Sequence, residues 1–165
     1  MRRILLSCAI VSGPWLASDL MALDPVINEI HPSPLLPAER TEFVEIHWPG
    51  EQALDLSGWR LTGGVEFTFP AGSRIDAGGF VVVAQDPGAL AARFRVAGLG
   101  PWTGRLGSTG ERLTLRDVSG TVRDSVGYGL GFPWPTVGEP PGYLLELIRP
   151  SLSNDLGGHW RASVV

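Results

Sequence analysis

The segment ERLTLRDVSGTVRDSVGY, which runs from Glu111 to Tyr128, is the best hairpin candidate in the sequence. Two β-type runs, Glu111–Val118 and Thr121–Tyr128, flank a Ser-Gly pair at positions 119 and 120. A short polar pair with glycine between two such runs is typical of a β-hairpin. Leu113 and Leu115 alternate with charged and polar residues, so one face of the hairpin is predicted to be buried and the other to face water.

The second arm of this hairpin carries a carboxylate on its apolar side. By a period of two, Asp124 shares a face with Val122, Val126 and Tyr128. A carboxylate on an apolar face must find hydrogen-bond donors or a cation. We therefore expect Asp124 to be held by loop N–H groups or by an arginine.

Six further β-type runs surround the hairpin along the chain, separated by Gly, Pro, Asp and Asn. They are Val26–His31, Thr41–Trp48, Leu54–Thr62, Val65–Phe69, Phe80–Gln85 and Tyr143–Ile148. One helix is predicted over Ala89–Val96, after Asp86-Pro87 as a cap and first-turn pair. Short strands at close spacing predict an all-β sandwich or barrel of about eight strands with one short helix.

Composition limits the class of protein. The 165 residues suffice for one domain, and 44% hydrophobic against 18% charged residues argues against disorder. Gly (22) and Pro (14) are abundant without a period, which favours a turn-rich β domain. All 13 basic residues are arginines, and 17 acids leave a net charge of −4. Nucleic acid is therefore not expected as a partner, because binding it normally requires a basic surface.

The N-terminus resembles a secretory signal peptide. Met1-Arg2-Arg3 is followed by a mostly apolar run, Ile4–Ala17, and by a small residue at Ala22. We predict a signal peptide over 1–22 and a domain over 23–165, with cleavage after Ala17 as the alternative. The only cysteine, Cys8, lies inside this segment, and the apolar run before it is too short for a lipoprotein signal. The predicted location is secreted or periplasmic, without disulfides and without an integral membrane span.

Several phrases in order resemble the lamin tail domain, an immunoglobulin-like β-sandwich found in nuclear lamins and in secreted prokaryotic proteins. They are VINEI (26–30), EFVEI (42–46), LDLSGWRL (54–61), FTFPAG (67–72), GGFVVVA (78–84), residues 108–115, DSV (124–126) and LEL (145–147). Their order and spacing match across about residues 26–162. The resemblance implies an immunoglobulin-like sandwich that acts by binding or scaffolding, since the family has no established catalytic centre.

The resemblance also implies fold-defining roles for individual residues. Gly58 is expected to permit a bend, Trp59 to fill the core and Trp160 to close one end of the sandwich. Four side chains, Asn28, Glu42, Asp55 and Asp124, are expected to hold turns through their oxygens, and Glu146 belongs to the last matched phrase. A Ca²⁺ site made from some of these acids is the alternative, although no run spaces them as a calcium loop does.

One triplet departs from the family pattern, because Glu29-Ile30-His31 is repeated as Glu45-Ile46-His47. In the second run Phe43, Glu45 and His47 form the face opposite Val44, Ile46 and Trp48. If the two strands pair antiparallel in a suitable register, Glu29, His31, Glu45 and His47 can converge as ligands for Zn²⁺. The alternative is two separate surface Glu–His pairs, and no bound cofactor is the preferred prediction.

Two loop tryptophans, Trp102 and Trp134, can bind sugars or a partner, or else cap the open end of the sandwich. The preferred function is an exported, non-catalytic module that binds an unidentified protein or extracellular polymer. The alternatives are a structural component that self-associates through edge strands and a small metal-dependent hydrolase built on the Glu/His cluster.

Overall fold

The computed structural model describes residues 23–33, 37–129, 131–135 and 142–164, so the predicted signal peptide at 1–22 lies outside the described residues. Within them the chain forms twelve strands in two five-stranded sheets and one two-stranded ribbon. The first sheet has the order β12 (Trp160–Val164), β11 (Tyr143–Leu147), β1 (Val26–Ser33), β2 (Phe43–His47) and β7 (Phe80–Ala84). The second has the order β10 (Val122–Gly129), β9 (Gly110–Arg116), β4 (Arg60–Thr62), β5 (Val65–Thr68) and β8 (Thr103–Gly104). The ribbon consists of β3 (Leu54–Asp55) and β6 (Arg74–Ile75).

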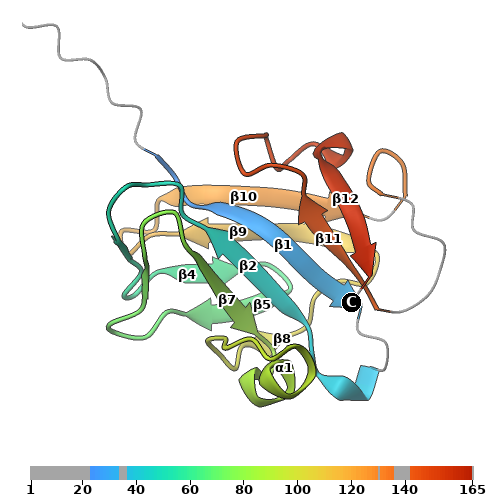
Figure 1. Cartoon of the computed structure of the whole chain (residues 1–165), viewed down its shortest axis with the longest axis horizontal. Coiled ribbons are helices and arrows are strands. Elements are labelled where there is room, and N and C mark those ends of the chain that lie inside the picture. Colours follow the sequence, from blue (N-terminus) through green and yellow to red (C-terminus); the bar gives the residue numbers. More distant parts are fainter. Residues whose placement is uncertain (1–22, 34–36, 130, 136–141, 165) are drawn as a thin grey trace, which may run out of the picture.

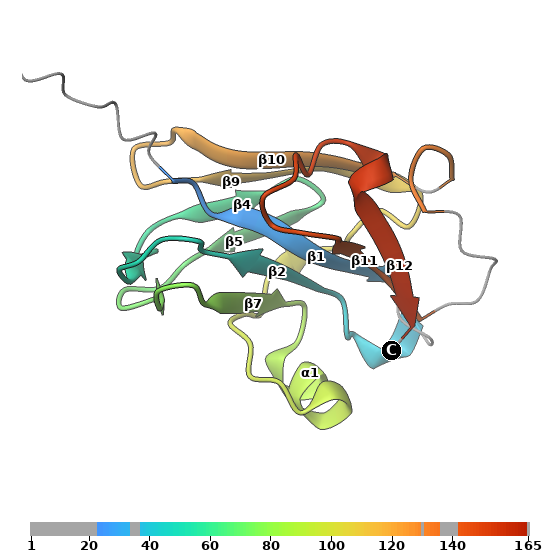
Figure 2. The same cartoon turned by 45° about the horizontal axis from the view of Figure 1, so that its top comes forward.

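The two large sheets lie over one another as layers (Figures 1 and 2). Every pairing between named strands is antiparallel. The apolar face of each sheet is turned toward the other, because that arrangement removes both from water. Fully buried side chains of both sheets form the core, including Ile30, Val44, Leu61, Leu115 and Val126. The predicted all-β sandwich is confirmed.

The predicted hairpin is the pair β9–β10. Leu113 lies opposite Val126, and both side chains are fully buried. A register shift between Val122 and Asp124 changes the phase of the alternation. Asp124 points inward as predicted, but Val122 is 47% exposed, so its predicted place on the buried face is wrong.

The prediction of about eight strands was too low. The run Leu54–Thr62 is broken by a turn at Ser57-Gly58 into β3 and β4. The two-residue strands β6 and β8 are too short for a period to reveal, and β12 follows Tyr143–Ile148, which was predicted to be the last strand. These strands are stabilised by pairing with residues distant in the sequence rather than by local propensity.

Helix α1 (Pro87–Phe94) begins and ends two residues earlier than predicted. The Asp86 carboxylate accepts hydrogen bonds from the N–H groups of Gly88 and Ala89, and Pro87 occupies the first turn. The helix lies beside β7 at one edge of the first sheet (Figure 2), while β12 forms the opposite edge. Two short 3₁₀ helices, η1 (Pro37–Glu39) and η2 (Gly157–His159), complete the described elements. No helix in the described part of the chain is long and apolar enough to cross a membrane.

Candidate binding pocket on the outer face of the first sheet

A bulge in β1 turns Glu29 away from the core. Between β1 and β2 the register shifts from Ile27↔Ile46 to Glu29↔Glu45, which leaves Asn28 as the extra residue. Ile27 and Ile30 are consequently both fully buried between the sheets, although they are three residues apart. Glu29 and Glu45 therefore lie directly opposite each other on the outer face.

The carboxylates continue across a third strand. Glu29 is also the register partner of Glu146 on β11, and Glu146 is in turn opposite Arg161 on β12. The Arg161 guanidinium donates to both carboxylate oxygens of Glu146, at 2.6 and 3.0 Å, so that charge is paired. Glu45 accepts one hydrogen bond, from Asn28 Nδ2 at 3.0 Å. Among the described residues, no hydrogen bond or ion pair reaches Glu29.

Burial and the neighbouring like charges raise the pKa values of Glu29 and Glu45. Burial, with added repulsion from Glu45 and Glu146, raises the pKa of Glu29 from 4.5 to about 7. Burial also raises the pKa of Glu45, the hydrogen bond from Asn28 opposes the rise, and repulsion from Glu146 adds to it. The pair therefore holds a proton more tightly than two isolated glutamates do.

Apolar side chains cover the neighbouring part of the same face. Leu90 and Phe94, four residues apart on α1, point toward Phe43 on β2. These side chains form a second hydrophobic cluster, separate from the main core, whose buried members also include Val82, Ala84 and Leu144. His31 is only 1% exposed, and its ring centre lies 5.3 Å from that of Phe43 and 5.9 Å from that of Phe94. Helix α1 thus buries apolar side chains on the outer face of the first sheet as well.

A pocket of about 280 Å³ lies where the carboxylates meet the apolar cluster. Its walls are Glu29, Glu45, Phe43, Val82, Leu90, Phe94, Val96 and Leu144. An adjoining hollow of about 320 Å³ shares Glu45, Val82 and Val96 with it and continues past Phe80 to Leu99. We call these two hollows together the outer groove, and the first of them the glutamate pocket.

The register does not gather the four predicted metal ligands. The two strands do pair antiparallel, but His31 lies opposite Phe43 and His47 lies opposite Val26, on either side of the Glu29–Glu45 pair. His31 is buried among aromatic rings, and the ring of His47 is 4.6 Å from that of Phe80. No group of three or more potential ligands in the described residues is placed to hold a metal ion. Glu29 and Glu45 do meet, but His31 and His47 do not join them, so the conditional four-ligand arrangement is not formed in the described residues.

The family of the chain follows from a comparison with family models. The model of the Lamin Tail Domain matches residues 22–130, which is 109 of the 165 residues. The chain belongs to the lamin tail domain family. The family consists of immunoglobulin-like domains, in agreement with the two-layered fold. None of the curated proteins matches the chain.

The matched range ends before the last strands of this lamin tail domain. Residues 143–147 and 160–164 nevertheless form β11 and β12 of the first sheet, and β11 pairs directly with β1. The resemblance over residues 26–162 is thus longer than the family match. Glu146 and Leu144, which help to form the outer face, come from this C-terminal part.

Three of the predicted turn-holding acids of the lamin tail domain accept backbone hydrogen bonds. Asp124 Oδ2 accepts from the N–H of Ile27 at 2.7 Å and from Asn154 Nδ2 at 2.7 Å, which joins β10 to β1 of the other sheet. Glu42 Oε2 accepts from the N–H of Leu106 at 2.9 Å. Asp55 Oδ1 accepts from the N–H of Ser57 at 2.8 Å.

Asn28 behaves differently from these acids. Its amide nitrogen donates to Glu45, while its buried Oδ1 has no hydrogen-bond partner in the described chain. The prediction that its oxygen holds a turn is therefore wrong. Asn154, which contacts both Asp124 and the carbonyl of Ile27, was not predicted, because it lies 127 residues from Ile27 in the sequence.

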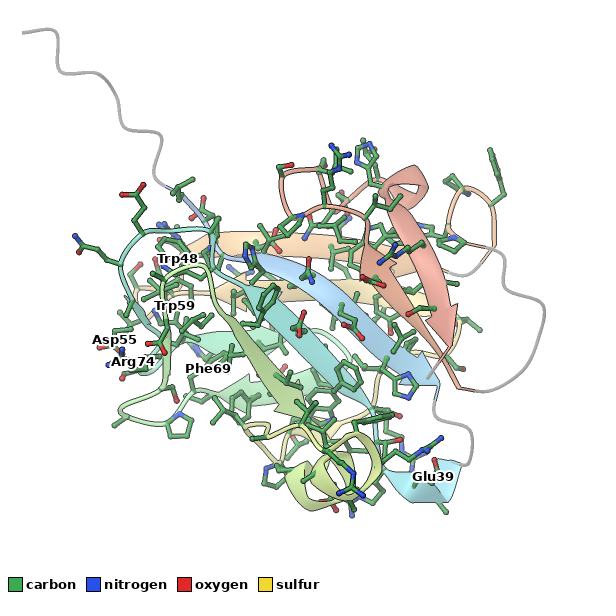
Figure 3. All side chains as sticks on the ribbon, viewed as in Figure 1. Glu39, Trp48, Asp55, Trp59, Phe69 and Arg74 are labelled. Carbon is green, nitrogen blue, oxygen red and sulfur yellow. The ribbon has the colours of Figure 1, made fainter. Side chains whose placement is uncertain are left out.

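Gly58 and Trp59 stabilise the end of the sandwich near the ribbon. Gly58 has a φ of +75°, which glycine adopts without strain, and its N–H donates to the carbonyl of Phe69. Figure 3 shows Trp59 at this end together with Asp55 and Arg74, which are paired in the β3–β6 ribbon. Trp59 is buried in the main core.

Trp102, proposed as a binding residue, is only 4% exposed and lies in the core, so it is not available to a ligand. Trp134 is half-buried, and its ring centre lies 5.6 Å from that of Trp160. Trp160 is buried, and its Nε1 donates to the carbonyl of Asn154. Both loop tryptophans thus pack against the body, whereas Phe132, in the same loop as Trp134, is 94% exposed.

Sequence reasoning missed the apolar walls of the glutamate pocket. Leu90 and Phe94 are spaced as neighbours on one helix face, a signal that was present in the sequence. Nothing local indicated that this face would cover the outside of the first sheet beside Val82 and Leu144. That arrangement depends on the tertiary course of the chain.

Proposed function

We propose that this lamin tail domain is an exported, non-catalytic interaction module that holds a segment of a partner protein in the outer groove. Membership of a family of immunoglobulin-like domains supports a binding role. The basic-then-apolar pattern of residues 1–22 supports export. Both parts of the proposal can be tested separately.

The observation that carries the binding role is the glutamate pocket itself. Half-buried carboxylates with raised pKa values line an apolar hollow, an environment that costs folding free energy without stabilising the core. Concave apolar sites with a few polar groups are where proteins usually bind ligands. The volume is close to the lower end of the roughly 300–1,000 Å³ that is typical of small-molecule sites, so a side chain of a partner is a suitable occupant.

The site can be tested by selecting random peptides on the immobilised domain and mapping the selected peptides by backbone NMR. We expect the largest shift changes at the amides of Val82, Val96 and Leu144. Val96 is 42% exposed at the rim, so V96R should abolish binding, whereas V118R, at a position 73% exposed in the β9–β10 turn, should leave it unchanged. Selection of no peptide, or of peptides that map to the second sheet, would overturn the proposal.

Export is tested by N-terminal sequencing of the protein recovered from the periplasm or the medium of the native cell. The expected N-terminus is Leu23, after removal of residues 1–22. Protein found only in the cytoplasm and beginning at Met1 would contradict this part of the proposal while leaving the groove unaffected.

A further inference from the structure

We infer that the group held in the glutamate pocket is the side chain of a lysine from the partner protein, with its ammonium group between Glu29 and Glu45. This inference rests on the proposed function of the outer groove, and it names the occupant of that groove.

The charge of the pocket is unbalanced. Glu29 and Glu45 are its only charged lining residues, and no described residue that lines it is basic. Arg161 is engaged by Glu146, and Arg93 lies over the Phe94 ring, 5.8 Å from its centre, on the exposed side of α1. A cation that enters the pocket removes the repulsion between the two carboxylates, which makes charge complementarity favour a basic group.

The shape of the pocket suits a charge carried on an aliphatic stem. Phe43, Val82 and Leu144 form apolar walls next to the carboxylates. A lysine side chain buries its methylene groups on apolar surface while its ammonium stays at a polar end. A small inorganic cation would make no use of these walls.

The donors and acceptors favour an ammonium group over a guanidinium group. Two opposed carboxylates on neighbouring strands present acceptors from two sides, and an ammonium is a compact charge with three donors. A guanidinium is a flat fork that matches one carboxylate at a time, as Arg161 shows on Glu146. Asn28 Nδ2 donates to Glu45 Oε1 at 3.0 Å, which occupies one acceptor of that carboxylate and leaves the others of the pair.

The composition of the chain shows where the lysine must come from. All 13 basic residues are arginines, so this chain has no lysine to offer to its own pocket or to that of a second copy. An ammonium on an aliphatic stem therefore belongs to another molecule. A partner protein is the source we propose, because the hollow past Phe80 to Leu99 leaves room for the residues that flank the lysine.

The experiment is an NMR titration of the isotope-labelled domain with N-acetyl-lysine methylamide. The comparison probes are the matching norleucine, arginine and glutamate compounds. We expect saturable shifts of the Glu29 and Glu45 side-chain carboxyl signals and of the Val82 and Leu144 methyl groups, with a dissociation constant of about 1 mM. Norleucine, which lacks the charge, and arginine, which lacks the compact ammonium, should each bind about tenfold more weakly or worse.

Variants locate the binding. E29Q and E45Q should each weaken the lysine probe about tenfold, whereas E66Q, at an exposed carboxylate on β5 of the second sheet, should leave binding unchanged. Circular dichroism and thermal melting of each variant show that the fold is intact. Equal binding of norleucine and lysine, or full affinity in the E29Q/E45Q double variant, would overturn the inference.

The peptides selected on the groove separate this inference from the function on which it rests. Selected peptides that map to the groove and share a lysine support both. Peptides that map there without a lysine, or with arginine in its place, overturn the lysine assignment and leave the groove as the binding site. Peptides that map elsewhere overturn the proposed function, whatever the lysine probe does.

Discussion

Asp124 and Glu29 are two partly buried carboxylates at opposite faces of the same strand β1, and burial raises the pKa of both. Asp124 reaches β1 from the other sheet and accepts hydrogen bonds from the Ile27 N–H and from Asn154. Glu29 faces two other glutamates and, within the described residues, receives no donor. The first carboxylate is satisfied by the fold, and the second is left with unused acceptors.

The difference indicates which acid contributes to stability and which is available for binding. A buried acceptor with partners stabilises the structure that places those partners around it. A half-buried acid without partners has a net cost, which natural proteins retain mainly at functional sites.

Replacing Asp124 should destabilise the fold, because its carboxylate joins the two sheets. D124A leaves the Ile27 N–H and the Asn154 amide without their acceptor, and we expect it to lower the free energy of unfolding by about 3 kcal/mol. D124N keeps one acceptor oxygen and should cost about half as much. Urea unfolding followed by tryptophan fluorescence measures both values, and equal stability of D124A and the wild type would show that Asp124 does not join the sheets.

Truncating Leu90, which packs α1 against the first sheet, should loosen the glutamate pocket and leave the main core intact. Leu90 is 1% exposed in the second cluster, and L90A should cost about 2 kcal/mol because α1 is held to the sheet mainly by Leu90 and Phe94. The local readout is hydrogen exchange at the Leu90 and Arg95 amides, which bond to the Asp86 and Ala91 carbonyls. Exchange should accelerate there and not at β9–β10, and equal acceleration in both places would contradict the division into two clusters.

Neutralising Glu29 should stabilise the protein, and the effect should depend on pH. The folded-state pKa of about 7 lies above the ordinary value of 4.5, so the folded state binds this proton more tightly than the unfolded state does. The contribution of Glu29 to the free energy of unfolding is therefore fully present below pH 4.5, and it is lost as the pH rises through about 7. After allowance for solvent screening, E29Q should gain about 1 kcal/mol at about pH 8 and almost nothing near pH 4.5.

Denaturant unfolding of E29Q at the two pH values checks this prediction, with E66Q as the matched control on the other sheet. A gain that is the same at both pH values would indicate a packing effect rather than titration. A loss of stability at alkaline pH would mean that Glu29 has a donor that holds its charged form, which would remove the contrast with Asp124.

Parts of the site were predictable from residues alone, and others were not. The Glu-Ile-His repeat raised the case in which Glu29 and Glu45 meet on paired strands, and the observed register places the two directly opposite each other. The repeat gave no information on register, and antiparallel pairing with Glu29 opposite Glu45 places the two histidines at opposite ends of the pair. Trp102 shows the same limit, since a tryptophan between Pro101 and Thr103 in a glycine-rich loop is nonetheless buried in the core.

Residues alone indicated the class of fold, the β9–β10 hairpin at one edge of the second sheet and the absence of lysine, because period, turn residues and composition are local properties. The tertiary structure alone decided that β12 completes the first sheet, that α1 covers the outside of β2 and β7, and that Glu29 meets Glu45 and Glu146. The physical reason is that these contacts join residues far apart in the chain. Their register depends on bulges and on the burial of whole faces, which no short stretch of sequence encodes.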